Sequence, residues 1–265
     1  MRPGEREWRA MQQVSNPPFS STLARAILTF EQIADSIRCR MSLLDEPHEF
    51  IPGVTHIPLS YPTYGADEVI EALDSLMSTW VTMGKKVKAF EEMFAEYVGK
   101  WLAVMVNSGS SANLLALSAL NLQPGDEVIT PALTWATTVW PIAQMGAIPV
   151  LVDVDRVSYN ISPSAIEAAV TPKTRAIMPV HVLGNPCDMD TIMDIARFHK
   201  LYVIEDCCES LGASYKGRKV GNFGNLSTFS FYFSHHITTI EGGMVLTSNS
   251  IWADMCRSQR SHGWM

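Results

Sequence analysis

The chain lacks any long apolar run, and none of its stretches approaches the about 18 residues that would cross a bilayer. No charged segment followed by an apolar one opens the sequence, so the pattern of a secretory signal is missing as well. The five cysteines (39, 187, 207, 208 and 256) show neither metal-site spacing nor the disulfide framework of a secreted protein. We therefore expect a cytoplasmic protein without a membrane segment and without a metal site.

Positive charge is also scarce. The sequence has 20 Lys and Arg against 27 Asp and Glu, a formal net charge of −7. Nucleic-acid binding needs basic surface that neutralises phosphates, so nucleic acid is not expected as a partner. A small anionic ligand remains compatible with this composition, because a local pocket matters more than the net charge.

Short apolar runs alternate with helical patterns from residue 101 onward. The predicted strands cover 102–106, 126–130, 148–152, 175–180, 201–205, 226–231 and 243–247. The predicted helices cover 111–120, 135–145, 163–170, 188–199 and 250–260. This alternation predicts an α/β fold, with a mostly parallel seven-stranded sheet and helices on both faces.

The residues before the alternating region follow other patterns. Apolar residues at helical spacing predict a helix over 22–40, and further helices are expected over 66–79 and 86–98. With 47% hydrophobic residues in 265, the chain can form one large domain, alone or with an appendage. We expect an N-terminal extension over 1–56 and a large domain over 57–265.

The segment 107–113, Asn-Ser-Gly-Ser-Ser-Ala-Asn, joins a predicted strand to a predicted helix. Free backbone N–H groups and the positive end of the helix dipole make such a junction a ready phosphate site. Gly109 permits close approach of the backbone, and the hydroxyls of Ser110 and Ser111 can donate. An ordinary capped helix start explains the same residues equally well when they are taken alone.

Two carboxylates follow a buried strand at 201–205, where ligands of parallel α/β sheets bind. Asp206 and Glu209 are therefore candidate site residues, although a solvated loop acid is the simpler explanation for a single aspartate. Trp135 follows the second strand and is either a core aromatic or a surface on which a ring stacks. The adjacent Cys207-Cys208 pair is either redox-active or, as we favour, two small residues at a strand end.

The segment 230–243, SFYFSHHITTIEGG, resembles the SFxxxKNITTGEGG segment of the DegT/DnrJ/EryC1/StrS sugar aminotransferases, which use pyridoxal phosphate (PLP). In that family the lysine forms a Schiff base with PLP, and His235 stands in its place here. Imidazole cannot form that bond, but it moves protons near neutral pH. The histidine form is similar to a subgroup of nucleotide-sugar 3-dehydratases that work with pyridoxamine phosphate (PMP).

The resemblance covers residues 57 to 264 and implies a role for each candidate. Gly109, Ser110, Ser111 and Ser230 bind the cofactor phosphate in this interpretation. Trp135 stacks on the pyridine ring, Asp206 pairs with the ring nitrogen, and Glu209 stands where aminotransferases carry a glutamine near the 3-hydroxyl. The implied fold is the large domain of aminotransferase fold type I. The family's small C-terminal domain lies beyond the last residue, so we expect a fragment or a truncated gene product.

The implied reaction removes the C3 hydroxyl of a 4-keto-6-deoxy nucleotide-sugar, in deoxysugar or lipopolysaccharide biosynthesis. His235 is the expected acid/base, and a homodimer is the expected assembly. One subtype regenerates PMP from L-glutamate, whereas the other recruits an iron–sulfur centre and a reductase, and the residues leave both open. Two other functions also remain: an aminotransferase-like protein that has lost its lysine, or a non-catalytic, cofactor-binding regulatory member. Lys216 and Lys219 fall in a surface turn, so neither is expected to replace the missing lysine.

Overall fold

The structure is a computed structural model that describes residues 28–43, 50–58 and 64–264. The chain divides into two units, one of residues 1–55 with 64–79, the other of residues 56–63 with 80–265. Helix α3 (Ala66–Met77) belongs to the first unit together with α2 (Phe30–Ser42). Our boundary at residue 56 assigns α3 to the large domain instead, and where the domain begins stays a prediction.

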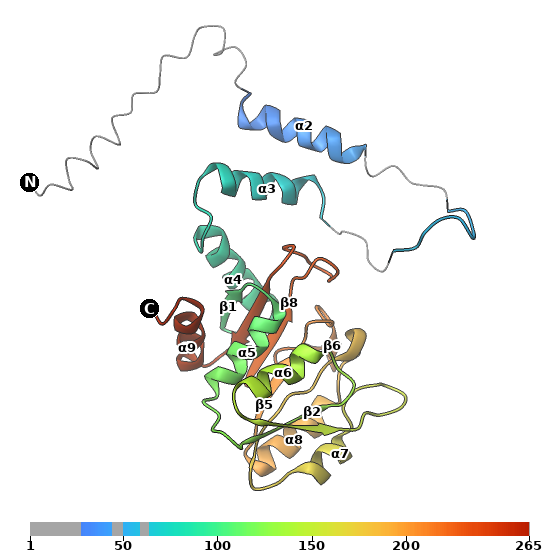
Figure 1. The fold of residues 1–265 in the computed structure, drawn as a ribbon, viewed down its shortest axis with the longest axis vertical. Coiled ribbons are helices and arrows are strands. Elements are labelled where there is room, and N and C mark those ends of the chain that lie inside the picture. Colours follow the sequence, from blue (N-terminus) through green and yellow to red (C-terminus); the bar gives the residue numbers. More distant parts are fainter. Residues whose placement is uncertain (1–27, 44–49, 59–63, 265) are drawn as a thin grey trace, which may run out of the picture. The chain divides into compact units, whose positions relative to one another are not determined.

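Helix α2 begins later than the predicted helix over 22–40. Thr29 is extended and caps the helix, because its hydroxyl accepts from the backbone N–H of Gln32 while the Gln32 side chain accepts from the N–H of Thr29. Residues 22–27 lie outside the described residues, and residues 28 and 29 are not helical. Helix α3 lies beside α2 (Figure 1).

The second unit contains the predicted seven-stranded sheet, in the order β1-β9-β8-β5-β4-β2-β3. Its strands are β1 (Leu102–Val106), β2 (Glu127–Pro131), β3 (Ile148–Val152), β4 (Thr174–Ile177), β5 (Tyr202–Asp206), β8 (Leu226–Ser230) and β9 (Gly243–Thr247). Only β9 runs against the others in this sheet, pairing antiparallel with both β1 and β8. The predicted strands agree with these bounds to within a few residues.

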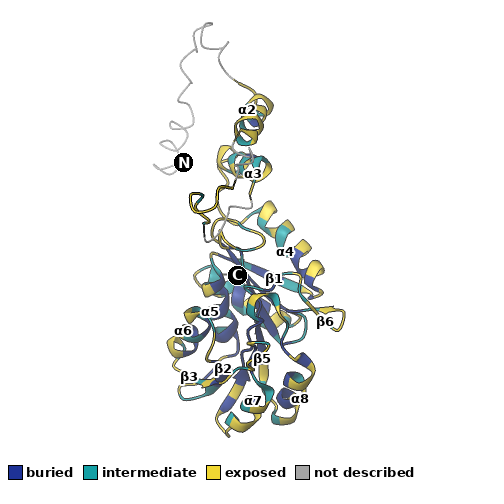
Figure 2. Cartoon of the chain, turned by 90° about the vertical axis from the view of Figure 1, so that its right-hand side faces the viewer, coloured by how far each residue is buried: buried dark blue, intermediate teal, exposed yellow. Residues whose placement is uncertain are grey.

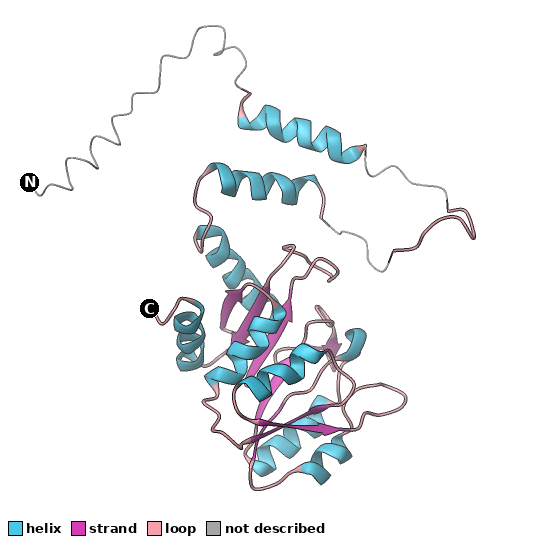
Figure 3. Cartoon of the chain, in the orientation of Figure 1, coloured by secondary structure: helices cyan, strands magenta, loops and turns pink. Residues whose placement is uncertain are grey.

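Helices precede, separate and follow the strands of this sheet along the chain, and Figure 3 shows them in cyan beside the magenta strands. They are α4 (Lys85–Val98), α5 (Gly109–Ala119), α6 (Ala136–Gln144), α7 (Pro163–Ala169), α8 (Met189–His199) and α9 (Ser250–Arg260), with a short 3₁₀ turn η1 (Val182–Gly184). Polar side chains begin several of them: Ser162 caps α7, Asp188 caps α8 and Asn249 caps α9. The sequence-based helices were therefore correct in position, with small shifts at their ends.

Successive side chains of a strand face opposite sides of the sheet, and three apolar clusters result. One cluster lies under α5, α6 and α9 and contains Ala112, Ile142 and Ala253. The opposite face carries a cluster under α7 and α8 and another under α4, which contains Phe94. Figure 2 shows the strands buried and the outer faces of the helices exposed.

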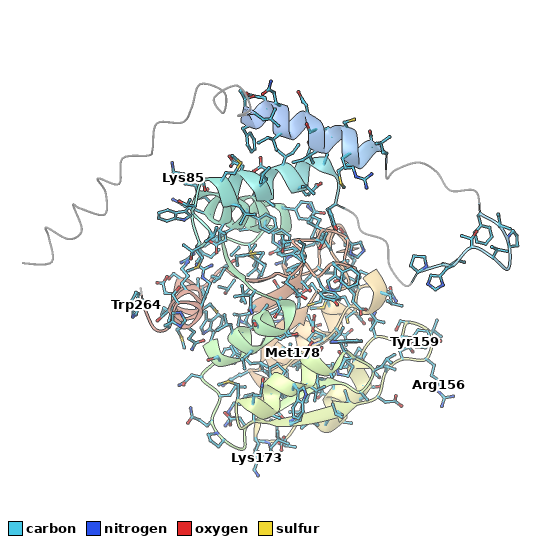
Figure 4. The ribbon with its side chains drawn as sticks, turned by 45° about the horizontal axis from the view of Figure 1, so that its top comes forward. Lys85, Arg156, Tyr159, Lys173, Met178 and Trp264 are labelled. Atoms are coloured by element: carbon cyan, nitrogen blue, oxygen red, sulfur yellow. The ribbon has the colours of Figure 1, made fainter. Side chains whose placement is uncertain are left out.

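Irregular segments lie at the periphery of the sheet unit. Figure 4 shows Met178 within the body of this unit, whereas Arg156, Tyr159 and Lys173 lie at its edge. A small hairpin of β6 (Ser214–Tyr215) and β7 (Arg218–Lys219) turns through two residues with positive φ. No helix among the described residues is long and apolar enough to cross a membrane.

Candidate active site

The candidate site residues gather at one edge of the sheet because the parallel strands end there. β1 ends at Val106, β5 at Asp206 and β8 at Ser230. β9 starts at the same edge, since Gly243 pairs with both Val106 and Ser230. Segments more than 100 residues apart are thereby brought together where parallel sheets bind ligands.

The N-terminus of α5 forms a cradle beside Ser230. Ser108 caps the helix, and its hydroxyl accepts from the backbone N–H of Ser111 at 3.1 Å. A Cβ on Gly109 would lie only 2.6 Å from the Cβ of Ser230, so a side chain at 109 would push the two segments apart. Ser110 is exposed in the first turn and Ser111 is half-buried. This open helix start fits the phosphate of a cofactor.

Gly243 is a second glycine that this cradle requires, and the sequence analysis did not identify it as a site residue. A Cβ there would lie 2.2 Å from the backbone oxygen of Ser108. The start of β9 therefore passes against the turn that leads into α5. An ordinary glycine-rich turn would explain the Glu-Gly-Gly motif in the sequence, and only the contact with Ser108 shows what the second glycine does.

Asp206 is a buried carboxylate with three hydrogen-bond donors. Its Oδ2 accepts from Asn113 Nδ2 at 3.0 Å and from Thr138 Oγ1 at 2.9 Å. Its Oδ1 accepts from the backbone N–H of Cys208 at 3.2 Å. Asp206 is 4% exposed, so this network takes the place of the water that a solvated loop acid would have. The simple loop interpretation of Asp206 is therefore excluded.

Glu205, the preceding residue, points to the other face of the sheet and has a different role. Its oxygens accept from the backbone N–H groups of Gly221, Phe223 and Gly224 at 2.6–2.7 Å. Burial acts to raise the pKa of Glu205, but the hydrogen bond from His181 and those from the backbone outweigh it, so the pKa falls below its usual value. Glu205 thus fixes the loop over 220–224.

His181, Glu205 and Cys207 bring their polar atoms within 4.8 Å of one another, as metal ligands do. The ring of His181 is already used, because Nδ1 accepts from the N–H of Cys187 at 3.0 Å and Nε2 lies 3.3 Å from Glu205. Burial raises the pKa of the Cys207 thiol well above its usual value, which disfavours the thiolate that a metal needs. Hydrogen bonding therefore accounts for this cluster.

The same reasoning applies to the adjacent thiols. Burial raises the pKa of Cys208 as well, and the Asp206 carboxylate adds to this effect. Both cysteines are free and sit at the end of β5. Raised pKa values disfavour the thiolates that redox activity needs, and Cys207 is buried as in the interpretation that we favoured, whereas Cys208 is partly exposed.

Trp135 is an exposed aromatic residue at the start of α6. It precedes Ala136, the first helical residue, and 75% of its surface is exposed. A core role for this tryptophan is therefore excluded. The same helix start carries Thr138, which binds Asp206, so an open ring face and a buried carboxylate are joined through one turn of helix.

The loop that carries His235 leaves the sheet after Ser230 and closes on itself at Phe231. The backbone N–H of Phe231 donates to Gly242 at 2.8 Å, and its carbonyl accepts from Thr239 at 2.9 Å. The Phe231 ring is buried and meets the ring of Phe94 edge-on, with centroids 5.2 Å apart. Phe231 therefore anchors the base of the histidine loop in the core under α4.

His235 is half-buried, and burial is the main reason why its pKa lies below the usual value of 6.5. The carboxylate of Glu209 opposes this shift, the neighbouring His236 adds to it, and Asp206 opposes it in smaller measure. Glu209 also accepts from the backbone N–H of Leu183 at 3.2 Å. His235 therefore lies within the electrostatic reach of both carboxylates and is poised to be neutral near pH 7.

The two lysines nearest in sequence to the histidine loop are engaged elsewhere. Lys216 pairs with Asp190, and Lys219 donates to the backbone oxygen of Tyr97 at 2.6 Å. Both belong to the β6–β7 hairpin, as expected for a surface turn.

The structure thus places Gly109 beside Ser230, and Trp135 in the same helix start as Thr138, a partner of Asp206. It also shows polar residues of the site that the sequence analysis assigned no role: Asn113 and Thr138. Each lies in a segment that we singled out, and each is 1% exposed. A buried polar side chain on an otherwise apolar helix face is the signal that could have identified them.

A mostly parallel sheet with an open helix start, an exposed tryptophan and a buried carboxylate at one edge defines a coenzyme-binding domain of the aminotransferase fold. The chain belongs to the DegT/DnrJ/EryC1/StrS aminotransferase family, whose model matches residues 62–265. The predicted family and fold are confirmed.

Three similar proteins illustrate the relationship. The dTDP-4-dehydro-2,6-dideoxy-D-glucose 3-dehydratase of Saccharopolyspora spinosa is 44% identical over 82% of this chain and 49% of its own length. The lipopolysaccharide biosynthesis protein RfbH of Salmonella typhimurium is 43% identical over 88% of this chain and 55% of its own. The E. coli GDP-4-keto-6-deoxy-D-mannose-3-dehydratase with bound hydrated PLP is 40% identical, with a TM-score of 0.76, over 79% of this chain and 55% of that chain. The chain spans about half the length of the curated relatives that it matches.

Proposed function

We propose that this protein is a PMP- and PLP-dependent dehydratase that removes the C3 hydroxyl of a 4-keto-6-deoxy nucleotide-sugar. The observation that carries the proposal is His235 at the family's lysine position, within reach of the charges of Asp206 and Glu209. The similarity to two sugar 3-dehydratases supports it. The pathway that we propose is deoxysugar or lipopolysaccharide biosynthesis, which the similarity to RfbH supports.

The residues of the sheet edge fit the cofactor group by group. Gly109, Ser110 and Ser111 at the start of α5, together with Ser230, would hold its phosphate. The exposed ring of Trp135 would cover one face of the pyridine, and Asp206 would accept a hydrogen bond from the ring nitrogen. Glu209, three residues after Asp206 on the same segment, would lie by the 3-hydroxyl.

When bound, PMP would supply an amine for the sugar's keto group and a ring that can take up electrons. The negative charge of Asp206 would keep the ring nitrogen protonated, which favours that uptake. The neutral ring nitrogen of His235 would take a proton from the cofactor carbon next to the amine, and the resulting imidazolium would donate a proton to the C3 hydroxyl, which leaves as water. A pKa below the usual value suits the first of these steps, because it keeps the imidazole unprotonated at neutral pH.

The test uses the absorbance of the protein with PLP and with PMP, followed by a 4-keto-6-deoxy nucleotide-sugar and mass analysis of the product. We expect noncovalent binding of both cofactors and a product that has lost one water. Borohydride treatment of the PLP-loaded protein should leave no pyridoxyl group on a lysine. A pyridoxyl-lysine peptide, or an aminated sugar without loss of water, would favour an aminotransferase instead.

The variant His235→Lys provides the matched comparison. Since the rest of the site matches an aminotransferase, the new lysine should bind PLP covalently and give its characteristic absorbance band, while dehydration falls. If PLP binds but the spectrum does not change, residue 235 does not face the reacting carbon of the cofactor. If the wild-type protein binds PMP or PLP but neither dehydrates nor aminates the nucleotide-sugar, the non-catalytic, cofactor-binding role becomes the better description.

We extend the proposal to the assembly and to the amino donor. Large apolar side chains exposed on the sheet unit, Trp101 and Trp140 among them, are the kind of surface that association covers, and we propose a homodimer. Sedimentation velocity at several concentrations tests this, and a monomer at all of them refutes it. L-glutamate as amino donor predicts that PLP-loaded protein converts to the PMP form on its addition. No conversion would favour the reductase-coupled subtype.

A further inference from the structure

The two donors to Asp206 Oδ2 form part of a closed network of buried groups. Thr138 and Asn113 donate to this one oxygen from two different helices, α6 and α5. Both side chains are 1% exposed, so no water competes for the carboxylate at this oxygen. The hydrogen bonds therefore hold the carboxylate plane in one orientation.

Each donor is in turn held by a further residue. The amide oxygen of Asn113 accepts from the hydroxyl of Thr228 on β8 at 2.6 Å, and its nitrogen also donates to the backbone oxygen of Thr137. The hydroxyl of Thr138 accepts from Thr134 Oγ1 at 2.8 Å. The network thus ties together β5, β8, α5 and α6.

As a result, the two carboxylate oxygens of Asp206 accept different numbers of hydrogen bonds. Among the described residues, Oδ2 accepts two side-chain donors, from Asn113 and Thr138, whereas Oδ1 accepts the backbone N–H of Cys208, at 3.2 Å. A carboxylate oxygen has two lone pairs, so Oδ1 has one acceptor position left. That position is the one available to a protonated ring nitrogen.

We propose that Thr138 and Asn113 are positioning residues, which occupy Oδ2 of Asp206 so that Oδ1 receives the ring nitrogen of the cofactor. This inference rests on the proposed cofactor site and adds to it two residues that do not touch the cofactor. Thr138 also lies one turn after Trp135 at the start of α6, so its position is coupled to that of the tryptophan. The hydroxyls of Thr134 and Thr138 therefore link the position of the stacking ring to that of the carboxylate.

The test is a titration of wild-type protein and of threonine variants with PMP and with PLP, followed by absorbance. Thr138→Val keeps the shape of the side chain and removes the hydroxyl. It should weaken binding of both cofactors by about 10-fold, the loss expected when a hydrogen bond to a charged group is removed. It should also shift the spectrum of bound PLP in the same direction as Asp206→Asn, measured beside it. Thr138→Ser keeps the hydroxyl and should bind and absorb like the wild type.

Thr130→Val is the matched control. Thr130 is a buried threonine whose hydroxyl donates to the backbone oxygen of Met178, outside the network. This variant should lose some stability and retain the wild-type affinity and spectrum. If Thr138→Val does not fold, Thr134→Val cuts the same network at a half-buried site and should weaken binding by about threefold.

Two results would overturn the inference. Wild-type affinity and spectrum in a folded Thr138→Val protein, or in Thr134→Val where Thr138→Val does not fold, would show that the hydroxyls do not position Asp206. An equal loss in Thr130→Val would show that any buried hydroxyl has this effect. The proposed function fails differently, since the wild-type protein itself would then bind neither PMP nor PLP, and the inference would fall with it.

Discussion

Asp206 shows how one residue acquires a role through its place at a strand end. The side chain is buried, accepts three hydrogen bonds and points to the α5–α6 face, whereas the adjacent Glu205 points to the other face and holds a loop. Two neighbouring acids thus have separate roles because side chains alternate along a strand.

Asp206→Asn should lower turnover far more than stability. The amide fills nearly the same volume but carries no charge to balance a protonated ring nitrogen. Loss of such a preorganised charge is expected to reduce turnover on the order of 10²-fold. Steady-state rates measured beside thermal unfolding check this, and near-wild-type turnover would place Asp206 away from the ring nitrogen.

His235 should titrate below 6.5, and Glu209 should control by how much. The Glu209 carboxylate favours the imidazolium and so raises the pKa of His235, against the effect of burial. Glu209→Gln removes that charge, so the pKa of His235 should fall further. The acid limb of the pH profile should then move to lower pH.

An NMR titration of the His235 ring in both proteins measures the shift directly. His236→Gln is a control with the opposite sign. His236 lowers the pKa of His235, so replacing His236 should raise the pKa of His235. A rise in the pKa of His235 in Glu209→Gln would contradict the assigned geometry.

Strand β8 and the loop after it connect the apolar cluster under α4 to the candidate active site. Phe229 and Phe231 are buried under α4, and Ser230 between them faces the start of α5. The alternation of a strand therefore anchors the histidine loop on one face while it presents a hydroxyl to the site on the other.

Phe231→Ala should destabilise this element strongly. The side chain is 1% exposed and packs against the rings of Phe90 and Phe94. Truncation of a buried phenylalanine costs about 3–5 kcal/mol in the free energy of unfolding. Urea unfolding measures the change, and Phe198→Ala, at an 80% exposed position, should leave the midpoint nearly unchanged. A loss below about 1 kcal/mol for Phe231→Ala would contradict the packing described for this loop.

The whole molecule has two units, and all three apolar clusters belong to the second. Their buried members lie from Phe94 to Cys256, so the described residues 28–43 and 50–55 contribute none of them. The units are therefore expected to be energetically separable.

Deletion of residues 1–55 should leave the sheet unit folded. The three clusters remain complete, so the thermal midpoint of the sheet unit, followed by far-ultraviolet circular dichroism, should change little. The same deletion should leave the affinity for PMP unchanged, because every proposed cofactor contact follows residue 100. Loss of the cooperative transition would show that the first unit supports the second.

The amino-acid sequence alone determined the order and type of the elements in the sheet unit. Apolar alternation and helical spacing are local properties, so the strands and helices could be placed to within a few residues. It also determined the position of Asp206 at a strand end and, through a local motif, the position of Gly109 and His235. Helix α2 was placed too early because the capping by Thr29 was not recognised.

Only the tertiary structure decided which residues meet. Asn113 and Thr138 reach Asp206 across 93 and 68 residues, and Gly243 meets Ser108 because β9 enters the sheet between β1 and β8. The apolar periodicity of the sequence does not predict such contacts, because they depend on the register of the strands and on which helix covers which face of the sheet. Individual residues supply the chemical groups of the site, and a local motif can reveal them. The hydrogen bonds that orient these groups form only when the strands and helices have packed together.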